Sequence, residues 1–342
     1  MFEPRFSRPR SDEHFEWANL RNKSRGKDKA MTQRGVYIVA NDRVFDQAIA
    51  LLTSLRDFDP DLPVFMVPFD DNCQGVAEVL TTKFDVQIFP DLDFLDRLTQ
   101  DIADIFPRDF LKLPNKMRKL SLWFGPLEEF IYIDTDILLF QSIEETLKYL
   151  NQADFLCCDF HYKGRGLSDV FSSIVREENI FSETDLLDVF NSGFWGSKKG
   201  LFSYDRMLEI LKECAAHREY FDFSSGTTDQ PIMNYLILTA IQRRANIVKL
   251  NPGETGSWGG SSHFEERNYR LYDQDRPLRY LHWAGTPMKP GGAYWDLWYY
   301  YRFKKTSEPL RNLALSSESP QKSWLSRFRG VMHNIKASLQ GK

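Results

Sequence analysis

Short apolar runs alternate with amphipathic segments along the first third of the chain. This pattern predicts strands separated by helices, because buried strands read as continuous apolar runs and surface helices carry one apolar stripe. The predicted elements, in order, are strand Gly35–Ala40, helix Asp46–Arg56, strand Val64–Val67, helix Cys73–Lys83 and strand Val86–Phe89. Asp42 precedes the first of these helices and is a candidate for its N-cap. The order favours an α/β fold with a mostly parallel sheet covered on both faces.

A longer apolar run, 130–140, carries two aspartates, Asp134 and Asp136. On a strand, residues two apart point to the same side, so both carboxylates are expected on one face. Two buried carboxylates are costly without a compensating cation, and a divalent metal is the simplest one. The alternative is that the strand ends at Ile133 and that the aspartates mark a turn. The apolar character resumes at once at Ile137, which favours the metal site.

The segment that leads into this run, Lys116–Leu127, is predicted to be a helix. In open α/β sheets, ligands bind beyond the carboxyl ends of the strands, where Asp134 and Asp136 are expected. The chain has no phosphate-binding loop of the Walker or Gly-x-Gly-x-x-Gly type, and no internal repeat. Any phosphate group must therefore be held by other residues.

Composition narrows the class of protein. The 342 residues are 42% hydrophobic, which is ample for a core, and the net charge of −4 gives no support for nucleic-acid binding. The cysteines lack zinc-type spacing and indicate reduced thiols in a cytoplasmic protein. They are Cys73, Cys157, Cys158 and Cys214. The sequence has no apolar run of the roughly 18 residues that a membrane span requires.

The two ends of the chain differ from the middle. Residues 1–33 are polar and basic without periodicity, and are predicted to be a disordered arm or an over-extended start ahead of Met31. After a basic linker that begins at residue 304, the segment 320–342 carries five Lys/Arg and no acidic residue, with apolar residues at helical steps. Such a helix can lie peripherally on the inner face of an anionic membrane, or pack its stripe onto the protein.

Five patches of sequence occur in an order that is similar to a known family. They are Val39–Asp42 with Leu52–Leu55, Met117–Leu120 before Tyr132–Asp136, Phe190–Phe194, Thr228–Asn234, and Leu281–Gly285 before Met288–Pro290. Through them the chain resembles, over Val36–Trp298, the GT-A class of nucleotide-sugar-dependent glycosyltransferases, most closely glycosyltransferase family 8, which includes glycogenin and bacterial galactosyltransferases. The resemblance implies one Rossmann-like GT-A domain over 34–303.

The resemblance also implies a metal site made by Asp134, Asp136 and His282. Carboxylate oxygens suit Mn²⁺ or Mg²⁺, and an imidazole ligand shifts the preference toward Mn²⁺. Lys289 would bind the diphosphate and stabilise the charge that develops on the leaving nucleotide. Taken singly, His282 would indicate a packed core residue and Lys289 a surface lysine. The spacing of Gly285 and Lys289 after His282 matches the family and favours the site.

The remaining implied contacts hold the nucleotide and the donor sugar. The residues that resemble nucleoside contacts are Ala40, Asn41 and Asp42. Either Arg118 or Lys119 resembles the basic residue that contacts donor phosphate or sugar, and Gly285 permits close backbone approach. The residues that resemble donor-sugar contacts are Asn191, Ser192, Gly193, Asp229 and Gln230. The structural alternatives are a turn at 191–193 and a helix N-cap at Asp229. Asp159, after a strand predicted at Phe155–Cys158, is a weaker candidate of the same kind.

The implied reaction is the metal-dependent transfer of a sugar, with retention of configuration, from a nucleotide diphosphate, expected to be UDP, to a hydroxyl of a glycan or glycolipid. Asp229 and Gln230 would shield the oxocarbenium-like centre, and Lys289 completes the expected catalytic set. The alternatives are a non-catalytic nucleotide-sugar-binding protein of the same fold, a nucleotidyltransferase, and a more distant GT-A family. Acceptor selection is expected in the interval 160–189, with a helix near Leu167–Glu178, and in the tryptophan-rich segment after His282.

Overall fold

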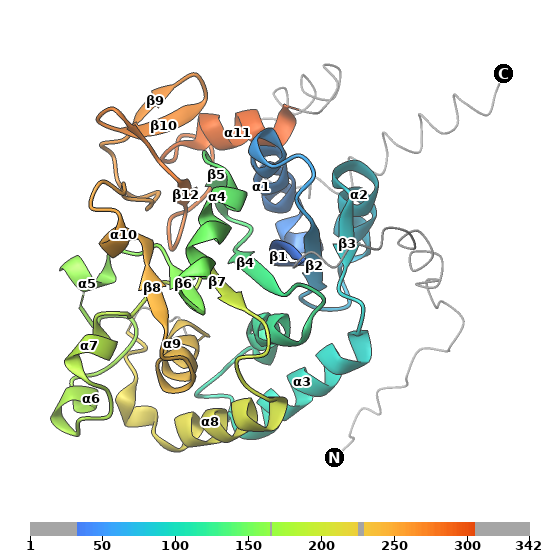
Figure 1. Cartoon of the computed structure of the whole chain (residues 1–342). Helices are drawn as coiled ribbons and strands as arrows, with labels where there is room; N and C mark the ends of the chain where they lie inside the picture. The colour runs from blue at the N-terminus through green and yellow to red at the C-terminus, as the bar shows by residue number, and fades with distance from the viewer. Residues whose placement is uncertain (1–32, 165, 225–228, 305–342) are drawn as a thin grey trace, which may run out of the picture. The chain divides into compact units, whose positions relative to one another are not determined.

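A seven-stranded sheet forms the centre of the protein, in the order β3-β2-β1-β4-β7-β6-β8 (Figure 1). The computed structural model describes residues 33–164, 166–224 and 229–304. The strands of this sheet are β1 Arg34–Ala40, β2 Val64–Pro68, β3 Val86–Ile88, β4 Glu129–Ile133, β6 Phe155–Cys157, β7 Phe194–Lys198 and β8 Arg244–Asn246. Neighbouring strands are parallel, except that β7 runs antiparallel to β4 and β6. The expected mostly parallel α/β sheet is therefore confirmed.

Two smaller sheets accompany the central one. The first pairs β5 with β12 antiparallel, and the second holds three strands in the order β11-β10-β9. Their bounds are β5 Ile137–Leu139, β12 Tyr280–His282, β9 Glu265–Arg267, β10 Arg270–Asp273 and β11 Arg276–Pro277. The pairing of β5 with β12 joins two segments far apart in the sequence, and it sets the position of the site described below.

Helices lie on both sides of the central sheet, with α1, α2 and α11 on one side and α3, α8 and α9 on the other (Figure 1). The longer helices are α1 Phe45–Phe58, α2 Gln74–Phe84, α3 Leu92–Ile105, α8 Tyr204–Ala216, α9 Asp229–Ala240 and α11 Trp295–Phe303. The shorter ones are α4 Ile143–Leu147, α5 His161–Gly164, α6 Ile174–Glu177, α7 Glu183–Leu186 and α10 Ile247–Leu250. Both faces of the sheet are thus buried, which explains why its strands read as continuous apolar runs.

Aromatic side chains fill the core between the sheet and the α3, α8 and α9 layer. Phe130 and Tyr132, two residues apart on β4, both contact Trp195 of β7, with ring centroids 5.8 and 5.4 Å away. Trp123 stacks on Trp195 at 4.9 Å, and its Nε1 donates to Ser197 Oγ at 2.9 Å. This packing fixes the carboxyl end of β4, from which Asp134 follows.

Two of the predicted helices differ from the structure, one in its type and the other in its length. The segment predicted as a helix over Lys116–Leu127 is a 3₁₀ helix, η4, over Pro114–Phe124. Every residue of Met117–Trp123 is buried, so this segment lacks the solvent face of an amphipathic α-helix. The helix predicted near Leu167–Glu178 is reduced to α6, because Asp169 adopts a left-handed backbone with φ 67°.

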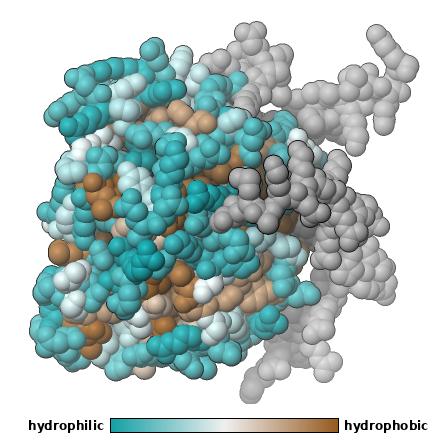
Figure 2. Space-filling model, viewed as in Figure 1, coloured by the Kyte–Doolittle hydropathy of each residue, from teal (hydrophilic) through white to brown (hydrophobic). Residues whose placement is uncertain are grey.

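The predictions for the two ends of the chain lie outside the described residues. They concern the arm over 1–33, apart from Gln33, and the basic linker and membrane-binding helix over 304–342, apart from Lys304. Within the described part of the chain, no helix is both long and apolar enough to cross a membrane. The face of the molecule in Figure 2 is mostly hydrophilic, with hydrophobic residues in small groups.

Candidate functional site

The turn between β4 and β5 carries Asp134 and Asp136. The expectation that both lie on one continuous strand is wrong, because β4 ends at Ile133 and β5 begins at Ile137 in a different sheet. The turn nevertheless directs both carboxylates to one place. β5 pairs antiparallel with β12, and Ile137 lies opposite His282. Strand pairing therefore brings His282 next to the aspartates.

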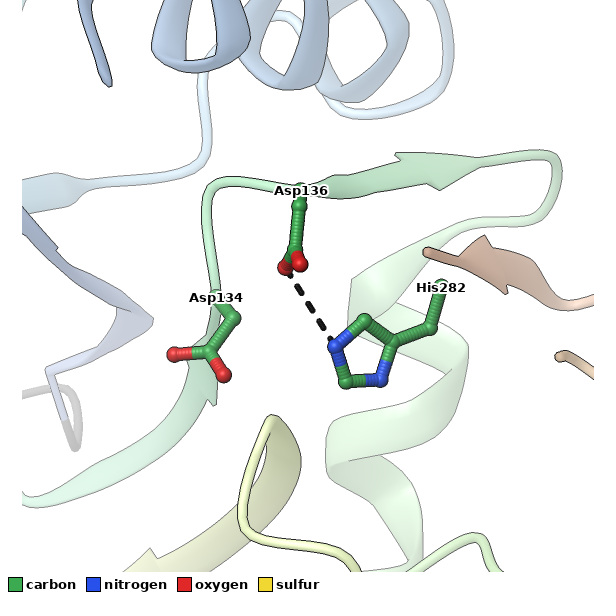
Figure 3. Close-up of side chains that lie close together, drawn as sticks. All are labelled: Asp134, Asp136 and His282. Carbon is green, nitrogen blue, oxygen red and sulfur yellow. Dashed lines mark ion pairs between the residues drawn. The ribbon is translucent and has the colours of Figure 1, made fainter. Parts of the chain in front are cut away.

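The three side chains lie close together, and those of Asp136 and His282 face each other (Figure 3). His282 Nε2 lies 3.3 Å from Asp136 Oδ1, and one potential ligand atom from each of the three residues lies within 4.8 Å of the others. His282 is buried, while the two aspartates are partly exposed. Backbone hydrogen bonds hold the group from both sides, since Asp134 N donates to Gly193 O at 2.8 Å and Trp283 N donates to Asp136 O at 3.1 Å. Asp134, Asp136 and His282 could bind a metal ion, and as a candidate site they are named the metal-binding group.

The electrostatics of this group favour a cation. Burial raises the pKa of Asp134 above its ordinary value, despite the opposing charge of Lys119. Burial acts in the same direction on Asp136, but the charge and hydrogen bond of His282 outweigh it and leave the pKa of Asp136 lowered. The pKa of His282 is raised, because attraction by Asp136 exceeds the effect of burial. Positive charge beside the two carboxylates is therefore favourable.

Gly193 packs directly against the side chains of His282 and Asp134. A Cβ atom at this position would lie 2.4 Å from His282 Cε1 and 2.9 Å from Asp134 Oδ2. Both distances are shorter than real Cβ contacts, so only glycine fits while the histidine and the carboxylate keep their places. Two carboxylates and one imidazole are a donor set suited to Mn²⁺ or Mg²⁺. The missing side chain at Gly193 leaves space next to these donors.

Replacing Gly193 with alanine is expected to weaken Mn²⁺ binding by roughly 10- to 100-fold, because the added methyl group must displace His282 or Asp134. Calorimetric titration with Mn²⁺ measures the effect. Gly164→Ala is the matched control, since among the described residues no atom outside its own helix and chain neighbours lies within 4 Å of a Cβ at Gly164. Wild-type affinity in Gly193→Ala would show that the glycine does not support the group.

A second polar cluster lies beside the first and centres on Asp229, the first described residue of α9. Lys119 Nζ is 2.8 Å from Asp229 Oδ2, and both side chains are largely buried. Lys116 approaches the other oxygen at 3.4 Å, and Ser192 Oγ lies 3.4 Å from Oδ2. Burial raises the pKa of Asp229, but the charges of Lys119 and Lys116 prevail and hold it far below its usual range. Asp229 is therefore an anion with a fixed partner.

Tyr132 connects the two clusters. Its hydroxyl donates to Asp134 Oδ1, and Lys119 Nζ lies 5.0 Å from the centre of its ring. Gln230, next to Asp229, accepts from Ser192 N through Oε1 at 3.3 Å. The loop predicted to contact donor sugar is thus bound to the start of α9. No role was predicted for Tyr132, although residues two apart on a strand point to the same side, which would place it beside Asp134.

Arg118 and Lys119 have different surroundings. The Arg118 guanidinium donates to Pro68 O at 2.9 Å, to Thr99 Oγ1 at 2.9 Å and to Asp96 Oδ1 at 2.7 Å. It therefore ties η4 to the end of β2 and to α3. Lys119 instead reaches the cluster around Asp229. The structure brings only Lys119 of this pair together with the metal-binding group.

The predicted nucleoside contacts lie at the carboxyl end of β1. Ala40 ends the strand and is buried, and Asn41 Nδ2 donates to Asp70 Oδ2 at 2.9 Å. The Asp42 carboxylate accepts from Val76 N at 2.7 Å and from Gly75 N at 3.3 Å. The prediction that Asp42 caps the helix after it is wrong, because it binds the first turn of α2 instead. These side chains shape the loops at the sheet edge.

Lys289 and Gly285 lie on the loop that follows β12, and both are exposed. Gly285 has φ +66°, a left-handed backbone that glycine adopts without strain. No hydrogen bond or ion pair of the Lys289 side chain is found within the described ranges. Lys289 thus follows His282 on an exposed loop, and its side chain makes no direct contact with the described residues of the metal-binding group.

Asn191 and Asp159 form a third set of contacts at the same edge. Asn191 Oδ1 accepts from Gly193 N at 2.9 Å, which holds the shape of the turn that lies against the metal-binding group. Asp159 Oδ2 accepts from Asn191 N at 3.1 Å, while its other oxygen accepts from His161 N at 2.7 Å. The turn expected at 191–193 is therefore present and is anchored from β6. Asp159 positions this turn through Asn191.

No family model and no curated protein matches the sequence. Among solved structures, the apo form of the bifunctional glycosyltransferase WbbM is similar, with a TM-score of 0.58 and 13% identity over 86% of this chain and 53% of that chain. This chain thus spans about half the length of WbbM. The galactosyltransferase LgtC with donor and acceptor sugar analogues has a TM-score of 0.47 and 14% identity, over 85% of this chain and 99% of that chain. For apo GlyE of Streptococcus pneumoniae TIGR4 the values are 0.48 and 12%, over 86% and 66%.

The likeness to WbbM, together with the strand order, confirms the expected Rossmann-like GT-A fold. At this level of identity the similarity concerns the fold alone. Membership of glycosyltransferase family 8 stays a prediction, as do the roles of the site residues.

Proposed function

We propose that the protein is a metal-dependent, retaining glycosyltransferase that moves a sugar from a nucleotide diphosphate, with UDP as the expected nucleotide, to a hydroxyl of a glycan or glycolipid. One observation carries this proposal: a carboxylate–carboxylate–imidazole group lies beside a buried anionic carboxylate at the ligand-binding edge of a GT-A sheet. A metal–diphosphate clamp and a stabiliser of positive charge are what glycosyl transfer from a nucleotide requires.

Asp134, Asp136 and His282 would hold Mn²⁺ or Mg²⁺. The bound ion would neutralise the diphosphate and act as a Lewis acid toward the leaving nucleotide. Gly193 leaves room beside this group. Lys289 is exposed on the loop that follows β12 and would reach a bound phosphate from there. Lys289 would then add a positive charge at the leaving group.

Asp229 and Gln230 would act at the donor sugar. Lys119 keeps Asp229 ionised and fixed in direction, so this carboxylate can stabilise positive charge at the anomeric carbon without becoming protonated. Gln230 holds Ser192 and its loop against the same cluster. In same-face transfer, the bond from the anomeric carbon to the diphosphate breaks and the bond to the acceptor oxygen forms. The acceptor proton passes to an oxygen of the departing diphosphate.

Thermal unfolding with Mn²⁺ and a set of nucleotide sugars (UDP-glucose, UDP-galactose, UDP-N-acetylglucosamine and GDP-mannose) tests the proposal. At a ligand concentration roughly 100 times Kd, a binding donor is expected to stabilise the fold by about 2.7 kcal/mol. The stabilisation should disappear when a chelator removes Mn²⁺. Slow hydrolysis of the same donor, measured as release of the nucleotide, is expected in parallel. Binding without hydrolysis or transfer would favour a non-catalytic nucleotide-sugar-binding protein, and no binding would refute the proposal.

A further inference from the structure

Trp258 is a large, exposed aromatic residue whose backbone pairs with that of His282. Its exposed fraction is 49%, although it lies in a part of the chain that packs closely around β12. Single exposed hydrophobic residues are common on protein surfaces and need no explanation by themselves. Trp258 differs from such residues because neighbouring residues fix its backbone, bind its indole nitrogen and cover one face of its ring.

The backbone of Trp258 is bound to the strand that carries His282. His282 N donates to Ser257 O at 2.7 Å, and Gly259 N donates to His282 O at 2.7 Å. These two bonds form a parallel β-bridge in which Trp258 is the partner of His282. Bridged backbones are about 5 Å apart, so Trp258 lies one strand spacing from a predicted metal ligand.

The indole ring has a fixed orientation. Its Nε1 donates to Ala284 O at 2.9 Å, which binds the ring to the residue before Gly285. A Cβ atom at Gly260 would lie 2.4, 2.5 and 2.7 Å from three consecutive atoms of the six-membered ring. Such similar distances place the Cβ over the face of the ring and not at its edge. The Gly260 backbone therefore supports one face, and the exposed area of Trp258 leaves the opposite face available.

A fixed indole with one open face is suited to a flat, partly apolar ligand. Pyranose sugars carry C–H bonds on the faces of the ring and hydroxyl groups around its rim, so they stack on aromatic rings while their hydroxyls stay in water. Binding to a ring that is already ordered costs little conformational entropy. A lipid or protein partner would need a wider apolar surface than one ring provides.

We propose that Trp258 is a sugar-stacking subsite that binds the acceptor glycan beside the metal-binding group. This inference rests on the proposed glycosyl transfer and names the class of acceptor as a pyranoside with an accessible C–H face. The donor diphosphate would lie over Asp134, Asp136 and His282, and a pyranose on Trp258 would lie next to it on the side of Gly285. Acceptor selection would then involve the segment before β12 as well as the segments predicted from the sequence.

Transfer to simple glycosides tests the subsite. The probes are methyl β-glucoside, methyl β-galactoside and methyl α-mannoside, each assayed with the donor that stabilises the protein most. Trp258→Ala is expected to raise KM for the accepted glycoside about ten-fold, the loss expected for one aromatic stacking contact. The effect on KM for the donor should be much smaller. Trp258→Phe should recover part of the loss, because a phenyl ring retains a stacking face.

Two further variants separate binding from folding. Gly260→Ala keeps the indole but displaces it, because the added methyl group would lie 2.4 Å from the ring, and is expected to raise the same KM with little change in kcat. Tyr269→Ala is the control, since Tyr269 is equally exposed at 49% but lies in the separate β9–β10 hairpin, where it stacks on Tyr300. It should leave KM for the glycoside unchanged.

Three outcomes would overturn the inference. The first is an equal rise in KM for donor and glycoside, which would place the ring on the donor. The second is an unchanged KM in Trp258→Ala, and the third is that wild-type protein uses none of the three glycosides while it still hydrolyses the donor. Absence of any donor binding in the wild type would instead refute the proposed glycosyl transfer, so the two failures are distinguishable.

Discussion

Replacing Asp136 with asparagine is expected to lower donor turnover by at least about 10³-fold and to abolish high-affinity Mn²⁺ binding. The change keeps the shape of the side chain and removes the charge that pairs with His282 at 3.3 Å. Loss of a Lewis acid worth several kcal/mol in the transition state corresponds to roughly this factor. Nucleotide release from the donor and calorimetric titration with Mn²⁺ measure the two effects.

Asp104→Asn is the control for this substitution. Asp104 is an exposed residue of α3 whose carboxylate accepts a hydrogen bond from Gln100 at 2.8 Å, one turn away on the same helix. Turnover and Mn²⁺ binding should be unchanged in this variant. Mn²⁺-dependent turnover at the wild-type rate in Asp136→Asn would show that the metal-binding group is misassigned, whichever donor is used.

Replacing Lys119 with methionine is expected to destabilise the protein by about 3 kcal/mol at neutral pH. The substitution leaves Asp229 buried without its closest partner, which lies at 2.8 Å in the native protein. Breaking a buried pair in this way typically costs about 3–5 kcal/mol. The lower end is expected, because Lys116 remains 3.4 Å from the other carboxylate oxygen. Urea unfolding measures the change in free energy.

The destabilisation should shrink in acid. In the native protein the pKa of Asp229 is depressed, so the pair contributes stability above the unfolded-state pKa of about 3.9, and this contribution is lost as the pH falls through the lower folded-state value. In Lys119→Met, burial instead favours a protonated Asp229, so acid removes the penalty of the unpaired charge. Unfolding at pH 7 and near pH 4 should therefore give a smaller difference at the lower pH.

Lys148→Met provides the matched comparison for an exposed pair. Lys148 lies 2.5 Å from Glu145, and both side chains are more than half exposed. Its loss is expected to cost no more than about 1 kcal/mol. An equally small effect for Lys119→Met at pH 7 would contradict the description of Lys119 and Asp229 as a buried ion pair.

Local sequence patterns predicted the central strands well. The runs at Gly35–Ala40 and Val64–Val67 correspond to β1 and β2, because strands buried on both faces are apolar throughout. Periodicity failed at η4, where Met117–Trp123 are all buried and the polar face that marks an α-helix is missing. It failed again at Asp134 and Asp136, because a continuous apolar run does not reveal that the chain leaves one sheet and enters another.

The sequence by itself determined the type of fold and the chemical identity of the candidate site, since the alternation of strands and helices and the carboxylate, imidazole and lysine groups can all be read from it. Only the tertiary structure decided which of these groups meet. The β5–β12 pairing sets His282 beside Asp136, packing separates Lys119 from Arg118, and Gly193 and Trp258 gain their importance from neighbours distant in the chain. Such contacts depend on pairing register and on packing between remote segments, and neither leaves a periodic signal in the local sequence.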